Sequence, residues 1–405
     1  MTFKKTFAII SAIATILLSG HVAAATKTQP PAGSASSALD MIVEQRMKEA
    51  EIVGIGAAII LNNKVVWTKG YGFADKANAT PFTTNTIMNI GSISKTVTGV
   101  ALMRAVQDGK LSLDEDINVY LPFKVINPFF PKEKITLRHL ATHTSGITDR
   151  WSVYEGTYRF GGDSPEPLGQ FLKNYFASTG MNYAKDNFLD VKPGTHREYS
   201  NIAAGLAGYI VELAVGEKLN VYTKQHIFAP LKMDNTGWFL SDISLSNHSK
   251  LYVAQGLVIP IQLYELTTYP DGGVRTSVAD LSKFFIALLN NGEYEGTRVL
   301  DSDSASEMLR FQFTDANRPK NFPAADGNSG LFWRTKYNGT RIGHGGSDPG
   351  IQTEMLAELS KDLGVIMFVN TSFSESEQGP SSAISDALWK YAVALKEEEQ
   401  RANAK

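Results

Sequence analysis

Residues 89–99 read Asn89-Ile90-Gly91-Ser92-Ile93-Ser94-Lys95-Thr96-Val97-Thr98-Gly99, and the interpretation of the whole chain starts from this stretch. Gly91 interrupts the segment before it, apolar residues then recur at helical spacing as far as Val106, and Gly109 follows. This pattern is typical of a buried helix with a glycine at its C-terminal end. The sequence therefore predicts a helix whose first turn contains Ser92.

Ser92 and Lys95 are three residues apart, so on a helix they share one face, about 4.5 Å apart along the axis. The first turn also directs unpaired backbone N–H groups and a partial positive charge toward whatever meets Ser92. Burial in an apolar helix is expected to lower the pKa of Lys95 until its amine can accept a proton. The alternative is an ordinary helix start with one exposed lysine, because Ser-x-x-Lys is a short pattern.

Composition limits the class of protein. The chain has 405 residues, of which 43% are hydrophobic and 20% charged, and its formal net charge is -2. That length favours two lobes over one core. The near-neutral charge argues against nucleic acid or an anionic membrane as the main partner.

The N-terminus has the pattern of an export signal. Lys4 and Lys5 precede an apolar stretch over residues 7–18, and small residues end at Ala25. We expect a signal peptide over residues 1–25, cleaved near Ala25, and a flexible leader over 26–37. No stretch is long enough to span a membrane stably, and the chain has no cysteine for disulfides or lipid attachment. A periplasmic or secreted location is the expectation.

Strand patterns lie at both ends of the remaining chain. A helix over 39–50 precedes strands over 55–61 and 65–71, with Asn62-Asn63 as a tight turn between them. Three more strands are predicted around 340–346, 352–358 and 364–370. After Pro380 comes an amphipathic helix whose apolar face carries Ile384, Leu388, Tyr391 and Leu395.

The predicted fold class is therefore α/β: one antiparallel sheet built from both chain ends and flanked by helices, plus a mainly helical lobe. We expect one domain over residues 38–400. Its α/β lobe covers about 38–108 and 330–398, and its helical lobe covers about 109–329, with the clearest helices at 202–215 and 279–291.

Two further motifs supply groups that a serine nucleophile needs. Tyr199-Ser200-Asn201 lies just before an apolar helix, where a phenol beside an ammonium group can be held as phenolate and take the proton of Ser92. His344-Gly345-Gly346 lies on the first C-terminal strand, where glycines on an edge strand let a substrate backbone approach. The alternatives are a buried tyrosine with a capping asparagine, and a strand end with a hydrogen-bonded histidine. Ser-x-x-Lys, Tyr-x-Asn and His-x-Gly each occur once in the chain.

In this order and on these elements, the three motifs resemble the penicillin-recognising serine hydrolases, in the branch of class C β-lactamases, D,D-peptidases, D-aminopeptidases and β-lactamase-like esterases. The likeness covers residues 40–395. It implies that Ser92 is the acylated nucleophile and that Lys95 and Tyr199 transfer its proton. It also implies that His344 helps to bind and protonate the substrate. By the same resemblance, Asn201, Gly346 and Ser347 are expected to bind the substrate, and the backbone N–H groups of Ser92 and Ser347 are expected to form the oxyanion hole.

One departure bears on the substrate. Most class C β-lactamases carry Lys-Thr-Gly where this chain has His344-Gly345-Gly346. A histidine is only partly charged near neutral pH, so its attraction for a β-lactam carboxylate is expected to be weaker. The expected function is a serine hydrolase acting on an ester, amide or D-amino-acid peptide. The alternatives are a class C-type β-lactamase and a penicillin-binding sensor that does not turn over.

No cofactor or metal is expected, and the expected partner is a small-molecule or peptide substrate. His139 and His143, four residues apart, are interpreted as structural because no third metal ligand is evident. The sequence does not predict an oligomeric state. The aromatic residues Trp151, Tyr154, Tyr158 and Phe160 either line the mouth of the cleft or pack in the core.

Overall fold

The computed structural model describes residues 34–254, 256–373 and 379–404. The predicted signal peptide, residues 1–25, and residues 26–33 of the predicted leader lie outside this range. Ser34, expected in the leader, already begins helix α1 (Ser34–Glu49).

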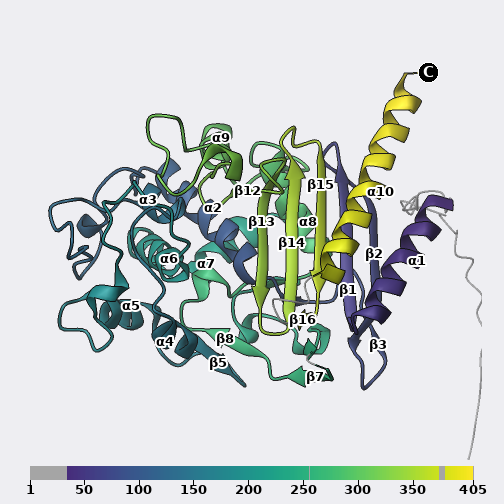
Figure 1. Cartoon of the computed structure of the whole chain (residues 1–405), viewed down its shortest axis with the longest axis horizontal. Coiled ribbons are helices and arrows are strands. Elements are labelled where there is room, and N and C mark those ends of the chain that lie inside the picture. Colours follow the sequence, from purple (N-terminus) through teal and green to yellow (C-terminus); the bar gives the residue numbers. More distant parts are fainter. Residues whose placement is uncertain (1–33, 255, 374–378, 405) are drawn as a thin grey trace, which may run out of the picture. The chain divides into compact units, whose positions relative to one another are not determined.

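A seven-stranded antiparallel sheet is built from both ends of the chain, as the sequence predicted (Figure 1). Its order is β12-β13-β14-β15-β1-β2-β3. The central pair joins β1 to β15, with Ile55 opposite Val369. The strands are β1 (Gly54–Leu61), β2 (Lys64–Asp75), β3 (Thr80–Pro81), β12 (Arg334–Lys336), β13 (Arg341–Asp348), β14 (Ile351–Glu358) and β15 (Leu363–Val369).

The turn between β1 and β2 confirms the predicted hairpin. Asn62 and Asn63 have φ values of 48° and 61°. Asparagine tolerates this left-handed conformation better than most residues, and two such residues in succession give a turn whose twist matches the strands.

Helices cover both faces of the sheet. On one face α1 packs beside α10 (Gly379–Asn403), and Leu39, Val43, Ile384 and Leu388 are buried against the strands. Tyr391 and Leu395 are partly buried against the same cluster, so the predicted apolar face of the last helix is confirmed. On the other face α8 (Val278–Leu289) packs against β1 and β15. Both faces of β1 are covered, which explains why all eight of its residues are buried.

The middle of the chain surrounds α2 (Ser94–Gln107), which is buried along most of its length. Helix α2 contacts α6 (Asn201–Val215), α7 (Leu219–Thr223) and α9 (Ser302–Leu309). The other helices here are α3 (Leu137–Ala141), α4 (Trp151–Tyr154) and α5 (Leu168–Phe176). The remaining short strands form small separate sheets: β4 (Met88–Asn89) with β9 (Arg275–Thr276), β5 (Tyr158–Phe160) with β8 (Tyr264–Leu266), β10 (Glu293–Tyr294) with β11 (Thr297–Arg298), and β6 (Leu251–Ala254) with β7 (Val258–Ile261) and β16 (Thr371–Phe373).

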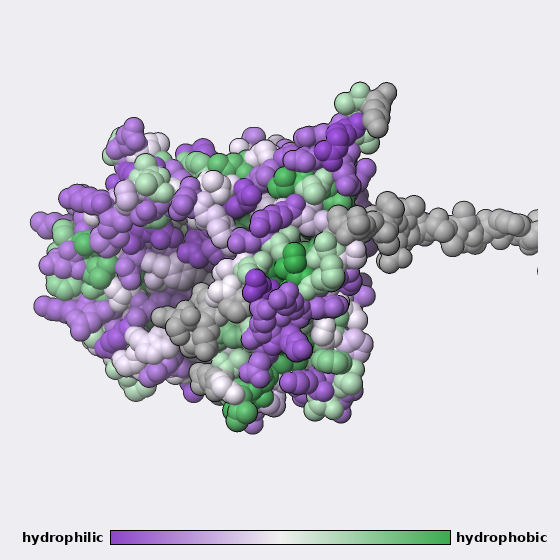
Figure 2. All heavy atoms as spheres, turned by 45° about the vertical axis from the view of Figure 1, so that its right-hand side comes forward, coloured by the Kyte–Doolittle hydropathy of each residue, from purple (hydrophilic) through white to green (hydrophobic). Residues whose placement is uncertain are grey.

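Figure 2 shows hydrophilic residues over much of one face, with separate hydrophobic areas between them. Among the described residues, no helix has the length and apolar character needed to cross a bilayer.

Candidate active site

Ser92 lies in a short turn that leads into the central helix. The prediction put Ser92 in the first turn of the α-helix, but residues Gly91–Ile93 form a 3₁₀ turn, η1, and α2 begins at Ser94. Gly91 has a φ of 53°, and a Cβ atom there would lie 2.9 Å from Oδ2 of Asp348. The tight turn therefore requires glycine. Ser92 remains partly exposed and lines a cavity.

Lys95 is fully buried beneath Ser92, and all three of its N–H groups find acceptors. Its Nζ donates to Oγ of Ser92 (3.0 Å), to Oδ1 of Asn201 (2.6 Å) and to the carbonyl oxygen of Asp271 (2.7 Å). An ammonium group has three donors, so its hydrogen bonding is complete.

The expectation that burial lowers the pKa of Lys95 is wrong. Burial does disfavour the charged form, but the interactions with Tyr199, Asp271 and Asp348 outweigh it, so the pKa lies above its usual value. Lys95 is therefore a cation that donates to Ser92 in the resting protein.

Asn201 is placed by the start of α6. Ser200 caps this helix by accepting from the N–H group of Ala203. Asp149 accepts three hydrogen bonds at the same helix end: from the N–H groups of Asn201 (2.7 Å) and Ile202 (2.9 Å) and from the hydroxyl of Ser200 (2.7 Å). Asp149 was not predicted, because it sits in a loop whose local pattern carries no signal.

Tyr199 lies between a histidine and the buried lysine. Its ring centroid is 4.3 Å from that of His143 and 5.0 Å from Nζ of Lys95. His143 is buried in a left-handed conformation (φ 58°), and its Nδ1 accepts from the N–H group of Ser200 at 3.2 Å. Burial lowers the pKa of His143 well below its usual value, which keeps the ring neutral. His143 is thus a structural support for Tyr199.

His139 is also structural. Its Nδ1 accepts from the N–H group of Thr136 at 3.3 Å, within a capping box at the start of α3. Among the described residues, no group of three or more His, Cys, Asp or Glu side chains is arranged to hold a metal ion.

His344 is buried on β13 and is neutral, which corrects the expectation of partial charge. Burial, together with the positive charges of Arg334 and Lys95, lowers its pKa well below the usual value. Its Nδ1 lies 2.6 Å from the carbonyl oxygen of Gly345. Because a carbonyl only accepts, the ring proton is assigned to Nδ1, which leaves Nε2 as an acceptor. A neutral ring of this tautomer offers the substrate neither a positive charge nor a proton.

Gly346 brings β13 directly against the Ser92 turn. A Cβ atom at this position would lie 2.2 Å from the carbonyl oxygen of Ile90, so no side chain fits. Strand β13 is not the edge strand that was expected, because β12 lies outside it. However, β12 pairs only with residues 341–343, so the stretch from His344 to Ser347 has no strand partner on that side.

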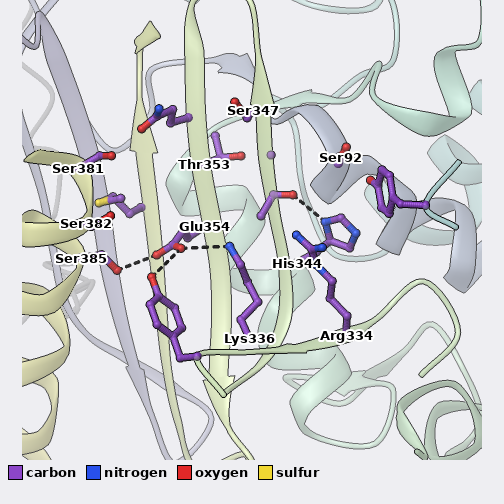
Figure 3. Close-up of a pocket in the computed structure, with 16 residues that line it drawn as sticks. Ser92, Arg334, Lys336, His344, Ser347, Thr353, Glu354, Ser381, Ser382 and Ser385 are labelled. Atoms are coloured by element: carbon purple, nitrogen blue, oxygen red, sulfur yellow. Dashed lines mark hydrogen bonds and ion pairs between the residues drawn. The ribbon is translucent and has the colours of Figure 1, made fainter. Parts of the chain in front are cut away.

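One cavity, of about 510 Å³, contains most of the predicted site (Figure 3). Ser92, Tyr199, His344, Gly346 and Ser347 line it, and Lys95 and Asn201 meet behind Ser92. The remaining lining residues are Arg334, Lys336, Tyr337, Gly345, Gln352, Thr353, Glu354, Met367, Ser381, Ser382 and Ser385. The charged members of this set were not predicted, because nothing in the local sequence shows that β12 and β14 reach the same cavity as Ser92.

The aromatic cluster divides between two environments. Trp151 and Phe160 are more than half exposed, whereas Tyr154 is buried and donates to Oδ1 of Asp271 at 3.0 Å. Tyr158 donates to Oδ1 of Asp348 at 2.6 Å. Burial raises the pKa of Asp271 to about 7 and that of Asp348 to about 6. The buried Tyr154 and the partly buried Tyr158 therefore support two carboxyl groups close to Lys95. None of the four rings lines the cavity.

The sheet is built from both chain ends, and a serine and a lysine are hydrogen-bonded where a central helix begins. A tyrosine and a histidine line the same cavity as the serine. Together these features define the β-lactamase-like class of proteins. The model of the family described as Beta-lactamase matches residues 39–388, so this chain belongs to that family.

Named relatives agree with this assignment. The chain is 24% identical over 334 residues to Protein flp of Staphylococcus aureus (strain MW2), an alignment covering 82% of this chain and 62% of that protein. It spans between about half and three fifths of the length of the first curated relatives it matches.

Solved structures share the fold. The octameric penicillin-binding protein homologue from Pyrococcus abyssi superposes with a TM-score of 0.69 at 24% identity, covering 89% of this chain and 77% of that one. The D-amino acid amidase from Ochrobactrum anthropi SV3, in complex with L-phenylalanine, gives a TM-score of 0.67 at 22% identity, covering 88% and 99%.

Proposed function

We propose that this protein is a serine hydrolase that forms an acyl-enzyme on Ser92 and acts on an ester, an amide or a D-amino-acid peptide. The observation that carries this proposal is the 3.0 Å hydrogen bond from the buried Lys95 ammonium to Oγ of Ser92, beside Tyr199 and on the wall of a cavity. A hydroxyl held by a buried cation next to a phenol is the arrangement expected of an activated nucleophile.

The proton of Ser92 passes to Tyr199 in this proposal. Lys95 is already charged and has three acceptors, so it cannot take another proton. Its positive charge instead favours the anionic form of the adjacent phenol, which then serves as the base. Oγ of Ser92 attacks the carbonyl carbon, the proton moves to Tyr199, and Tyr199 returns it to the departing oxygen or nitrogen. Water then releases the acyl group by the reverse sequence.

The oxyanion that forms on attack is proposed to meet the backbone N–H groups of Ser92 and Ser347. Ser92 sits where α2 begins, and the partial positive charge of a helix N-terminus favours an anion. The close contact of Gly346 with Ile90 supports this role for Ser347, because it holds β13 beside the turn that carries Ser92.

The proposed binding roles follow the same geometry. Asn201 holds Lys95 at 2.6 Å and is available to a substrate amide. His344 offers Nε2 as an acceptor for a substrate N–H or hydroxyl group. The export pattern of residues 1–25 supports a periplasmic or secreted location, where D-amino-acid peptides of the cell wall are accessible.

Labelling with a fluorophosphonate probe and a substrate panel test the proposal. The panel contains 4-nitrophenyl butyrate, nitrocefin and a peptide ending in D-Ala-D-Ala. We expect clear ester cleavage, weak nitrocefin turnover, and loss of both labelling and turnover in Ser92→Ala, because nucleophile and base act as a unit. Ser246→Ala, at an exposed serine far along the chain, is the control.

Full activity of Ser92→Ala would refute the acyl-enzyme. A burst of product without steady turnover would show a penicillin-binding sensor instead of a hydrolase, and fast nitrocefin hydrolysis would favour a class C-type β-lactamase.

A further inference from the structure

The ammonium group of Lys336 occupies the space that a side chain at Gly345 would fill. A Cβ atom on Gly345 would lie 2.9 Å from Nζ of Lys336 and 3.1 Å from the carbonyl oxygen of Thr353. Gly345 follows His344 in the third motif, so this cation reaches the motif from the neighbouring strand β12. The absence of a side chain at position 345 is therefore what admits the ammonium to the cavity wall.

Glu354 holds Lys336 in this position. It lies opposite Gly345 in the register of β13 and β14, and its Oε1 is 3.3 Å from Nζ of Lys336. Its two oxygens also accept from the hydroxyls of Tyr337 (3.0 Å) and Ser385 (2.7 Å), as Figure 3 shows. The ammonium of Lys336 makes one hydrogen bond to the described residues, which leaves two of its three N–H groups for a ligand.

The side chains around Gly345 carry a net positive charge. Arg334 and Lys336 are cations, Glu354 is the single carboxylate among the described lining residues, and His344 is neutral. Among the side chains that β12, β13 and β14 contribute to the cavity, the balance is thus one net positive charge. The side chain of Arg334 makes no hydrogen bond or ion pair within the described residues, and its buried Nε has no acceptor. Its Cζ lies 5.8 Å from the centroid of the Tyr199 ring. A bound anion would accept hydrogen bonds from the unpaired N–H groups of both cations.

We propose that Lys336, seated against Gly345 and held by Glu354, is a specificity-determining residue that binds a carboxylate of the substrate within the cavity that Ser92 lines. This proposal rests on the proposed function. Glu354 accepts one hydrogen bond from the Lys336 ammonium, and the substrate carboxylate accepts hydrogen bonds from the other two N–H groups. A carboxylate bound by an ammonium makes charge-assisted hydrogen bonds, which are stronger than neutral ones.

Two pairs of esters, matched except for charge, test the proposal and locate the carboxylate. The first pair, 3-carboxyphenyl and 3-carbamoylphenyl butyrate, places the charge on the leaving group. The second pair, 4-nitrophenyl 4-carboxybenzoate and 4-nitrophenyl 4-carbamoylbenzoate, places it on the acyl group. The readout is kcat/KM for the charged ester divided by kcat/KM for the neutral one, because this ratio cancels any loss of folded enzyme.

Three variants have different expected effects on this ratio. Lys336→Gln should lower it about tenfold in one of the two pairs, the usual size for a lost hydrogen bond to a charged group. Gly345→Ala should lower it in the same pair, because the added methyl displaces the flexible end of Lys336 while its charge remains. Glu354→Gln should raise it, because the competing carboxylate is gone. The double variant at positions 336 and 345 should be no worse than Lys336→Gln alone, since both act through one ammonium.

Lys390→Gln, at an exposed lysine of α10, is the control and should leave the ratio unchanged. If Lys336 and Glu354 form only a structural pair, then Lys336→Gln and Glu354→Gln will change the ratio alike or not at all, and the proposal is wrong. Turnover of the neutral esters by Ser92→Ala would overturn the proposed function itself, so the two failures are distinguishable.

Discussion

Removing the carboxyl group of Asp149 tests how the N-terminus of α6 positions the site. Asp149 accepts three hydrogen bonds, from the N–H groups of Asn201 and Ile202 and from the hydroxyl of Ser200. Each is worth about 1 kcal/mol net, and a negative charge at a helix N-terminus adds about 0.5 kcal/mol. Because Asp149 is partly exposed, water replaces some of these contacts. We therefore expect Asp149→Ala to lower the free energy of unfolding by about 2 kcal/mol.

The same change should affect activity beyond its effect on stability. Oδ1 of Asn201 accepts from the Lys95 ammonium at 2.6 Å, so loosening the helix end displaces the ammonium that donates to Ser92. Misplacement by about 1 Å can cost as much as a hundredfold in rate, and we expect kcat/KM to fall between about tenfold and a hundredfold. Asp149→Asn keeps one acceptor oxygen and should lose about half of the free energy.

Urea denaturation and ester hydrolysis at a temperature where the variants are folded provide the measurements. Asp190→Asn, at an exposed aspartate whose side chain makes no hydrogen bond within the described residues, is the matched control. The reasoning is refuted if Asp149→Ala unfolds within about 0.5 kcal/mol of the wild type and retains its kcat/KM, since surface substitutions stay within that range.

Two further predictions follow from burial and close packing. The pKa values of Asp271 and Asp348 are raised to about 7 and about 6, against 3.8 as the ordinary value, so between about pH 4 and 7 the folded state binds more protons than the unfolded state. The contribution of these two carboxyl groups to the free energy of unfolding is therefore full below about pH 4 and is lost as the pH rises to about 7. Urea denaturation at a series of pH values should show that the free energy of unfolding falls less steeply with pH in Asp271→Asn than in the wild type. Identical slopes in the two proteins would contradict this. Gly346→Ala places a methyl 2.2 Å from the carbonyl oxygen of Ile90, and because backbone cannot give way cheaply, ester hydrolysis should fall by at least about tenfold. Activity equal to the wild type in a folded Gly346→Ala protein would show that β13 is free to move away from the Ser92 turn.

The sequence predicted the parts of the fold that depend on local pattern. Runs of β-favouring residues identified the strands at both ends, and Asn62-Asn63 identified the hairpin, because these signals are carried by neighbouring residues. The pairing of Ser92 with Lys95 was also local, since helical spacing alone places them together.

The features that the sequence did not predict depend on residues that are distant along the chain. The pKa of Lys95 is raised by Tyr199, Asp271 and Asp348, which lie more than 100 residues away, so its own apolar neighbours gave the wrong direction for its pKa. Asp149 is a loop residue whose role exists only once the start of α6 packs against it. Lys336 acquires a neighbour at Gly345 only through the arrangement of strands in the sheet.

The pairing of β1 with β15 has a consequence for biosynthesis. Strand β1 is among the first described segments to leave the ribosome, but its partner ends at Val369, more than 300 residues later. Contacts that close such long loops form late and slowly. A nascent chain that already contains the Ser92 turn and its helix lacks the strand that carries His344 and Ser347 until β13 has been made. The cavity that Ser92 lines therefore cannot form on the nascent chain before the strands β12 to β14 have been added.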